Sequence, residues 1–288
     1  MILISVIICA HNPRPHYLGR VLDALRAQTL PLEKWELLLV DNASAEPLSG
    51  RVDLTWHPNA RHIHEMSLGL THARLRGIVE AEAGLLVFVD DDNVLEIDYL
   101  EYAQAIAATH PDLGVWSGSV GLEFEQPPAE WTQPYWNWLT AREVLEDVQF
   151  RSSTDSPNTP YGAGICVRRE VGLFYRDQSL KSPTRQSLDR KGASLTSAGD
   201  VDLALTACDM ELDMGLFARL RLTHLIPPER LTEEYLLRLR RDGIMSLWLL
   251  RFIRGKRLAR LPQGLKWWTK FLYDALRKRG RARRFYMA

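Results

Sequence analysis

The sequence contains few cysteines, no long apolar run and no glycine-rich phosphate loop, and each absence excludes a class of protein. Its three cysteines, Cys9, Cys166 and Cys208, are widely spaced without a CxxC pair. Neither a disulfide framework nor a zinc knuckle is indicated, and a cytoplasmic location is expected. The apolar start, residues 1–10, is too short to span a bilayer and has no basic leader, so we expect a buried strand there. Residues 11–15, His-Asn-Pro-Arg-Pro, hold no glycine, which disfavours a nucleotidyltransferase.

A central apolar run ends in three consecutive aspartates. Residues 85–89, Leu-Leu-Val-Phe-Val, have the length and composition of a buried strand, and Asp90, Asp91 and Asp92 follow directly. In open α/β folds, ligands bind at the carboxyl edge of the sheet, where these side chains are expected to lie. Adjacent carboxylates repel one another unless a cation lies among them. The pattern predicts a divalent-metal site that holds a phosphorylated ligand; the alternative is a solvated acidic turn.

Apolar strands alternate with helical spacing over the first 113 residues, which predicts an α/β fold with a mainly parallel sheet flanked by helices. The expected strands span residues 2–10, 35–40 and 85–89. Right-handed crossovers place the ends of all three along one edge of the sheet. Asp41 and the three aspartates should therefore share a crevice.

Several short segments, in the order in which they occur, together resemble a family 2 glycosyltransferase with the GT-A fold. The family's members of the inverting, bacterial surface-polysaccharide type are the most similar. The segments are Ser5–Asn12, Val40–Ser44, Gly69 with Ala73-Arg74, Val89–Asn93, Gly162–Gly164 with Arg168-Arg169, Gly199–Leu203 and His224–Thr232.

The resemblance implies a donor site for a nucleotide-diphosphate sugar, UDP- or GDP-linked, and Mn²⁺ or Mg²⁺ as cofactor. Asp92 and His224 would hold the metal, since carboxylate oxygens and imidazole nitrogen suit these ions. A contact with the diphosphate and a purely structural role are the alternatives for His224. Asp41 would accept a hydrogen bond from the nucleobase; an Asx-turn or helix cap is the alternative for its carboxylate. The remaining residues expected to contact the donor are Ala10, Asn12, Arg74, Asp90 and Asp91.

Asp200 is the expected general base, because inverting transfer needs a carboxylate to take the proton of the acceptor hydroxyl. The family pattern has Glu-Asp at this point, whereas this chain has Gly199-Asp200, and Asp202 remains a rival. Helical spacing places Asp200 and Asp202 on different faces, so one of them should face the site; a helix cap is the alternative role of Asp200. The resemblance assigns Gly162, Ala163 and Gly164 to the acceptor side, and Trp136 could stack on a sugar there or pack in the core.

The positive charge is concentrated at the end of the chain, although Lys and Arg number 36 in total, as do Asp and Glu. Residues 251–288 contain thirteen Lys or Arg and one acid, Asp274. An apolar stripe at helical spacing accompanies them, formed by Leu265, Trp268, Leu272 and Leu276. This pattern favours an anionic membrane surface, so a peripheral position on the inner face of the plasma membrane is expected. Packing on the domain and a homodimer contact are alternatives; nucleic acid is not expected, because no nucleic-acid motif is present.

These observations predict a glycosyltransferase that moves a hexosyl or N-acetylhexosaminyl group to a glycan or lipid-linked acceptor. Residues 1–113 would form the nucleotide-sugar-binding half and residues 114–232 the acceptor-binding half of one GT-A domain. A helical, basic and aromatic extension would follow over residues 233–288. The alternatives are a nucleotidyltransferase and a non-catalytic sugar-nucleotide-binding scaffold.

Overall fold

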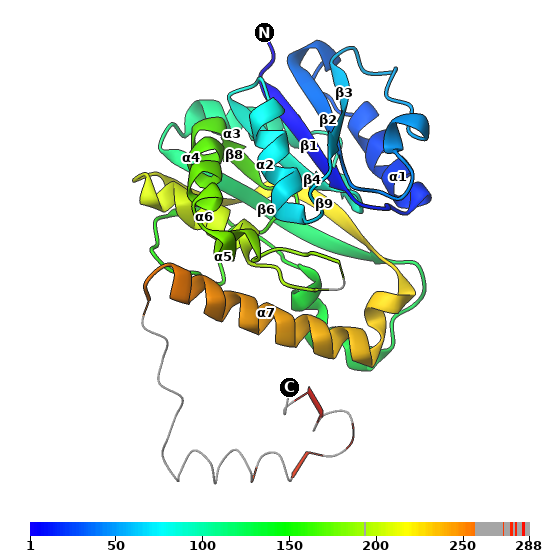
Figure 1. The fold of residues 1–288 in the computed structure, drawn as a ribbon, viewed down its shortest axis with the longest axis vertical. Helices are drawn as coiled ribbons and strands as arrows, with labels where there is room; N and C mark the ends of the chain where they lie inside the picture. The colour runs from blue at the N-terminus through cyan, green and yellow to red at the C-terminus, as the bar shows by residue number, and fades with distance from the viewer. Residues whose placement is uncertain (193, 257–272, 274–276, 279, 281–283, 286–288) are drawn as a thin grey trace.

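The described part of the chain folds around one sheet of nine strands, with helices on both faces (Figure 1). A computed structural model describes residues 1–192 and 194–256, together with Tyr273, Arg277, Lys278, Gly280, Arg284 and Phe285. The strands are β1 Ile4–Ala10, β2 Trp35–Asn42, β3 Ala60–Glu65, β4 Leu85–Asp90, β5 Asn93–Leu95, β6 Leu113–Phe124, β7 Val148–Phe150, β8 Cys166–Arg168 and β9 Asp213–Ile226. The α-helices are α1 Pro15–Arg26, α2 Leu70–Glu80, α3 Tyr99–Thr109, α4 Arg169–Leu180, α5 Pro183–Gln186, α6 Gly199–Asp209 and α7 Glu233–Ile253. The 3₁₀ helices include η3 Glu130–Leu139 and η4 Pro228–Leu231.

The first half of the sheet is parallel, in the order β3-β2-β1-β4. In this register Ala10 lies opposite Asp41, and Cys9 lies opposite Asp90. Strands β1, β2 and β4 are almost wholly buried, as expected for apolar runs covered on both faces. The strand ends therefore meet at one edge, as predicted.

The second half of the sheet is mixed. Strand β8 pairs antiparallel with both β4 and β6, while the long strands β6 and β9 run parallel to each other. Strands β5 and β7 pair antiparallel with β9. The predicted α/β class is confirmed, and the parallel arrangement belongs to its N-terminal half. The sheet continues through residue 113, so the two predicted halves share it.

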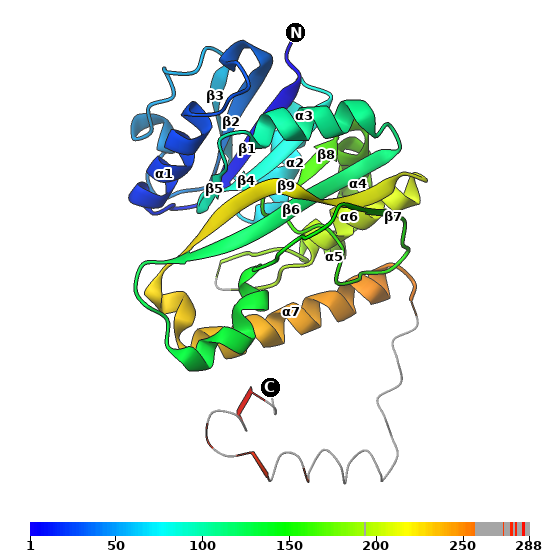
Figure 2. The ribbon, with the colours of Figure 1, turned by 180° about the vertical axis from the view of Figure 1, so that it is seen from behind.

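Two apolar layers hold the helices on the sheet. Helices α2, α4 and α6 cover the face turned to the viewer in Figure 1, and α1 and α3 cover the face seen in Figure 2. Leu18, Val21 and Leu25 of α1 recur at helical spacing and pack against one face of the sheet. A third apolar cluster joins η3, α7 and Phe285 below the sheet.

Helix α4 buries Val171 and Tyr175, although no helix was predicted at residues 169–180 from the sequence. Strand β9 runs from Asp213 to Ile226, and its first half pairs with both β6 and β7.

The predicted apolar stripe around Trp268 lies outside the described residues. Among the residues that are described, no helix is long and apolar enough to cross a membrane.

Candidate active site

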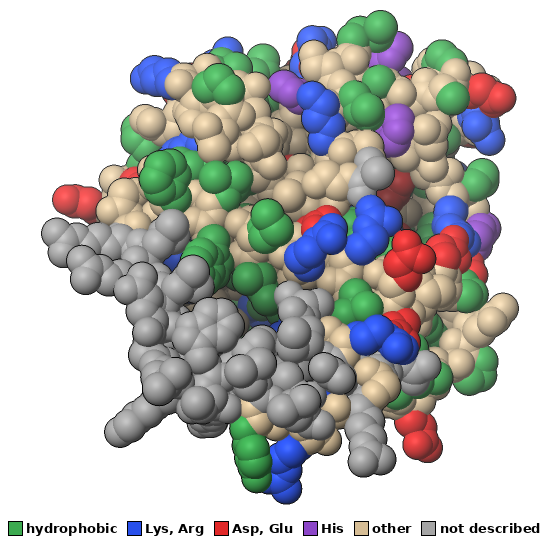
Figure 3. All heavy atoms as spheres, turned by 60° about the horizontal axis from the view of Figure 1, so that its bottom comes forward, with side chains coloured by type: hydrophobic (Ala, Val, Ile, Leu, Met, Phe, Trp, Pro, Cys, Tyr) green, Lys and Arg blue, Asp and Glu red, His purple; other side chains and the backbone are tan. Residues whose placement is uncertain are grey.

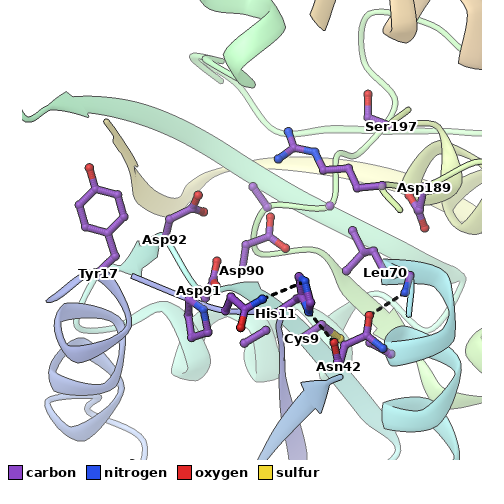
Figure 4. Close-up of a pocket in the computed structure, with 18 of the residues that line it drawn as sticks. Cys9, His11, Tyr17, Asn42, Leu70, Asp90, Asp91, Asp92, Asp189 and Ser197 are labelled. Atoms are coloured by element: carbon purple, nitrogen blue, oxygen red, sulfur yellow. Dashed lines mark hydrogen bonds between the residues drawn. The ribbon is translucent and has the colours of Figure 1, made fainter. Parts of the chain in front are cut away.

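A cavity of about 500 Å³ opens at the carboxyl edge of the parallel strands. This volume is in the range of cavities that bind small ligands and cofactors. In Figure 4, the three aspartates lie near Tyr17 and His11, while Asp189 and Ser197 lie on the opposite side. The predicted site residues that line the cavity are Ala10, Asn12, Arg74, Asp90, Asp91, Asp92, Gly162, Ala163, Asp200 and His224.

Asp90, Asp91 and Asp92 occupy the end of β4 and the turn into β5. Burial raises the pKa of Asp90 above its usual range, and the charge of Asp92 raises it further. Burial, followed by the charges of Asp92 and Asp90, raises the pKa of Asp91 to about 8. Burial acts in the same direction on Asp92, but its positively charged neighbours, Arg230 among them, outweigh it and hold its pKa well below the usual range. Asp92 is therefore the carboxylate of this cluster that is most firmly ionised.

Asp92 lies against His224 because β5 pairs with β9, which places Asn93 opposite His224. Oδ1 of Asp92 accepts a hydrogen bond from the side-chain amide of Asn93 at 2.9 Å. The other oxygen, Oδ2, lies 3.4 Å from His224 Nε2. On the other side of the ring, His224 Nδ1 lies 3.0 Å from the carbonyl oxygen of Leu139. A carbonyl only accepts hydrogen bonds, so we assign the proton to Nδ1 and the lone pair to Nε2.

These two side chains fit a divalent cation only in part. Within the described residues, no group of three or more His, Cys, Asp or Glu side chains is arranged to hold a metal. Asp92 and His224 offer one oxygen and one nitrogen, and the Leu139 carbonyl fixes the orientation of the imidazole ring from its other nitrogen. Mg²⁺ is commonly bound by one or two protein ligands that are completed by substrate phosphates and water. The donor set therefore fits a cation that binds together with a diphosphate.

Asp200 faces the cavity from the first turn of α6. Its Oδ2 accepts a hydrogen bond from the Gly162 amide at 2.7 Å, and its Oδ1 accepts one from Val201 at 2.8 Å. Burial raises the pKa of Asp200, while the nearby charge of Arg74 opposes that rise. The N-cap position is Ala198, so Asp200 lies inside the helix and does not cap it.

Asp202 points away from the cavity. Its side chain is fully buried and accepts from Arg254 Nε at 2.8 Å, with Arg185 Nε 3.6 Å away. The two carboxylates of α6 therefore differ in surroundings, and Asp200 is the one that lines the cavity.

Comparison with known proteins then identifies the family. The family model described as Glycosyl transferase family 2 matches residues 5–167. The chain belongs to glycosyl transferase family 2. The predicted class of enzyme is thus confirmed at the level of the family.

Solved structures show the same fold. S. aureus TarS residues 1–349 match with a TM-score of 0.56 at 15% identity, covering 95% of this chain and 79% of that one. The same protein in complex with UDP-GlcNAc matches with a TM-score of 0.58 at 14% identity, covering 85% and 66% of the two chains. The GT-A fold predicted from the sequence is confirmed.

Curated relatives match over a shorter span. The putative glycosyltransferase EpsH of Bacillus subtilis is 28% identical over 112 residues, 38% of this chain and 32% of the relative. The uncharacterized protein y4gI of Sinorhizobium fredii is 31% identical over 114 residues, 38% of this chain and 12% of the relative. The chain thus aligns with less than a third of the EpsH sequence and about an eighth of y4gI.

Opposite the aspartates of this family 2 member, a buried ion pair joins α2 to the segment before α6. Arg74 Nη1 lies 3.0 Å from Asp189 Oδ2, which also accepts from the Thr71 hydroxyl at 3.0 Å. Asp189 was not predicted as a site residue, because residues 176–198 are polar and show little helical or strand periodicity. Its carboxylate fills the space beside Gly199: a Cβ at residue 199 would lie 2.2 Å from Asp189 Oδ2. The Asp189 carboxylate thus lies beside Gly199, the position at which the family's Glu-Asp pattern has glutamate.

The predicted nucleobase contact, Asp41, does not line the cavity. Its two oxygens accept from the amides of Ser44 and Leu48, at 3.1 and 2.9 Å, in the turn arrangement considered as the alternative. Its neighbour Asn42 does line the cavity, and the Asn42 backbone carbonyl accepts a hydrogen bond from His11 Nδ1 at 2.8 Å. Contact between Asp41 and a base stays a prediction.

Of the four residues predicted on the acceptor side, two line the cavity and two do not. Gly162 and Ala163 line the cavity. Gly164 lies behind them with a positive φ of 66°, and its carbonyl accepts from the Tyr99 hydroxyl at 2.6 Å. Trp136 packs in the third apolar cluster, 4.9 Å from Phe124 between ring centroids. The structure thus places Trp136 in packing outside the cavity lining.

The further lining residues that were missed as site residues include Arg190, Arg230 and Tyr235. Arg230 stands in the segment that carried the family resemblance, so the sequence held a signal for it. Arg190 follows Asp189 in the stretch without periodicity, which gave no signal.

Proposed function

We propose that this protein is a metal-dependent inverting glycosyltransferase that uses a UDP- or GDP-linked sugar. It transfers the sugar to a hydroxyl of a glycan or lipid-linked acceptor in surface-polysaccharide biosynthesis. The observation that carries the proposal is one cavity with the Asp92–His224 pair on one wall and Asp200 on another. Carboxylate and imidazole ligands suit a diphosphate-bound cation, and a separate carboxylate suits the base of an inverting transfer.

In this mechanism Asp200 takes the proton of the acceptor hydroxyl as its oxygen bonds to the anomeric carbon. The bond from that carbon to the diphosphate oxygen breaks on the opposite face, and the diphosphate leaves with the bonding electrons. Asp92 and His224 would hold the Mg²⁺ or Mn²⁺, which would supply Lewis-acid stabilisation of the leaving group. Arg190 and Arg230 line the same cavity and add positive charge beside it.

The raised pKa of Asp200 favours this role, because a base with a pKa nearer neutrality accepts a proton more readily. Hydrogen bonds from Gly162 and Val201 hold the carboxylate in place. TarS has been solved with UDP and with UDP-GlcNAc, which supports a UDP-linked donor here, with an N-acetylhexosaminyl group as one candidate.

The predicted membrane contact extends in this proposal onto α7. Met245, Trp248 and Phe252 recur at helical spacing and are 63%, 41% and 65% exposed. Arg241 and Arg251 are exposed on the same helix, and the basic segment follows it. Figure 3 shows apolar and basic side chains, with acidic ones among them, on the lower side of the molecule as drawn in Figure 1. This combination suits anionic phospholipid. A Met245→Ser/Trp248→Ser/Phe252→Ser variant should lose co-sedimentation with anionic vesicles; retained co-sedimentation would contradict the α7 contact.

The test of the catalytic proposal is nucleotide-diphosphate release from UDP- and GDP-sugars with Mn²⁺ and candidate acceptors. Release should be abolished by Asp92→Ala and by Asp200→Asn. Asp209→Asn is the matched control, because Asp209 is a more exposed carboxylate at the end of the same helix as Asp200. Release of pyrophosphate would instead indicate nucleotidyl transfer. Tight donor binding without turnover on any acceptor would favour the scaffold alternative.

A further inference from the structure

The guanidinium of Arg230 lies between the two proposed metal ligands. Its Nη1 is 2.9 Å from Asp92 Oδ2 and 3.0 Å from His224 Nε2. Arg230 comes from η4, directly after β9, so the same chain segment supplies both the histidine and the arginine. The side chains of Asp92 and His224 are 8% and 9% exposed, whereas that of Arg230 is 21% exposed.

This arrangement uses the lone pair that a metal would need. Because His224 Nδ1 carries the proton toward Leu139, Nε2 has a single lone pair, and the Arg230 N–H donates to it. Arginine has only donors and stays charged, so the roles in this contact are unambiguous. A cation bonded to Asp92 Oδ2 and His224 Nε2 at about 2.1 Å would overlap the Nη1 position.

We propose that Arg230 holds the cation position in the donor-free protein, and that the divalent cation and the diphosphate displace it together. This inference rests on the proposed function. The guanidinium neutralises Asp92 while the site has no ligand, which keeps a buried carboxylate paired. When it is displaced, its planar donors can bind the incoming diphosphate oxygens in a bidentate manner. The diphosphate oxygens thus replace the Asp92 carboxylate as the partner of the Arg230 guanidinium when the metal binds Asp92.

Two consequences distinguish this arrangement from a preformed metal site. Mn²⁺ alone should bind weakly, because it must displace Arg230 without offering the guanidinium a new partner. Mn²⁺ and a nucleoside diphosphate should each strengthen the binding of the other, and such couplings are commonly about 5- to 150-fold.

The test is isothermal titration calorimetry of Mn²⁺ with the full-length protein, without nucleotide and with saturating UDP or GDP. The variant is Arg230→Met, which removes the charge and the donors but keeps a side chain of similar length. The matched control is Arg190→Met, which removes one positive charge from the same cavity but leaves the Arg230 bridge in place. Thermal unfolding establishes that each variant is folded.

Arg230→Met should bind Mn²⁺ alone at least about tenfold more tightly than the original protein, and the coupling to nucleotide should fall by a similar factor. Arg190→Met should strengthen Mn²⁺ binding less than about threefold, as expected from long-range electrostatics. If Arg230→Met leaves Mn²⁺ binding unchanged or weaker while the original protein binds Mn²⁺ with nucleotide, the inference is wrong and the metal-dependent function stands. If the original protein binds no Mn²⁺ even with nucleotide, the inference and the metal requirement both fail.

Discussion

Replacing Arg74 should move the pH dependence of catalysis upward, because its charge opposes the rise in the pKa of Asp200. A Cβ added at Gly162 would lie 2.7 Å from Arg74 Nη2 and 3.1 Å from Asp200 Oδ2, so both charged groups border the same point. Those two distances place the charged groups within about 6 Å of each other, where the attraction at an effective dielectric constant of about 20 is about 3 kcal/mol. Asp189 offsets part of this attraction, so Arg74→Met should raise the pKa of Asp200 by only part of it.

The sign follows from the role of Asp200 as a base. Only the ionised carboxylate accepts a proton, so turnover rises as the pH increases through its pKa. Arg74→Met raises that pKa, which moves the rising limb of the kcat profile to higher pH. Asp189→Asn removes a charge that raises the pKa of Asp200, so it should move the limb to lower pH. The double variant should lie near the original protein.

Nucleotide-diphosphate release measured from pH 4.5 to 9 gives the profile, and thermal or urea unfolding gives the stability cycle. Arg74→Met should cost about 3–5 kcal/mol of stability, because it leaves Asp189 buried and unpaired; adding Asp189→Asn should restore most of it. If Arg74 instead contacts the donor, as the sequence predicted, the single variant should raise the KM for the donor and Asp189→Asn should not rescue it. Shifts of both single variants in the same direction would refute the electrostatic argument.

Other variants probe the same cavity. Gly162→Ala should lower kcat at least about tenfold with little loss of stability, since the new methyl group would crowd both Arg74 and Asp200; unchanged kcat would contradict this placement. Gly199→Glu alone should destabilise the protein by about 1–3 kcal/mol, because its Cβ meets the Asp189 carboxylate. Adding Asp189→Gly should recover stability in a urea titration, and failure to recover would show that the two positions do not exchange a carboxylate. Asp92→Ala should abolish Mn²⁺-dependent release, and a larger effect of Asp91→Ala would place the metal ligand one residue earlier.

Sequence periodicity predicted those elements whose buried residues form a recognisable local pattern. Strands β1, β2 and β4 are continuous apolar runs, because parallel strands covered on both faces have no solvent side. Helix α4 was not predicted because its apolar residues do not gather on its buried face: Val171 and Tyr175 are buried, whereas Phe174 is 37% exposed. Its position depends on tertiary contacts with α2 and α6, which a local pattern does not contain.

The same division applies to the site. Asp90, Asp91 and Asp92 were predictable because a strand end fixes where they lie. The Asp41 carboxylate accepts hydrogen bonds from the backbone amides of Ser44 and Leu48, and a local sequence pattern does not reveal this turn. The sequence therefore predicted the correct edge of the sheet for Asp41, although its side chain does not line the cavity. Asp189 could not be predicted as a site residue, because it lies in an irregular segment. Its place beside the cavity depends on the long-range ion pair with Arg74.

The two arginines on opposite walls of the cavity have different relations to their carboxylates. Arg74 and Asp189 are 6% and 3% exposed, and neither is shared with a proposed ligand, so their ion pair is a permanent part of the fold. Arg230 is 21% exposed and shares its donor between Asp92 and His224, both of which are proposed to bind the cation. Loss of Arg74 should therefore lower stability more than loss of Arg230, whereas loss of Arg230 should alter the coupling between cation and nucleotide more. The cavity thus has one arginine that stays in its ion pair and one that is proposed to leave its carboxylate when the cation binds.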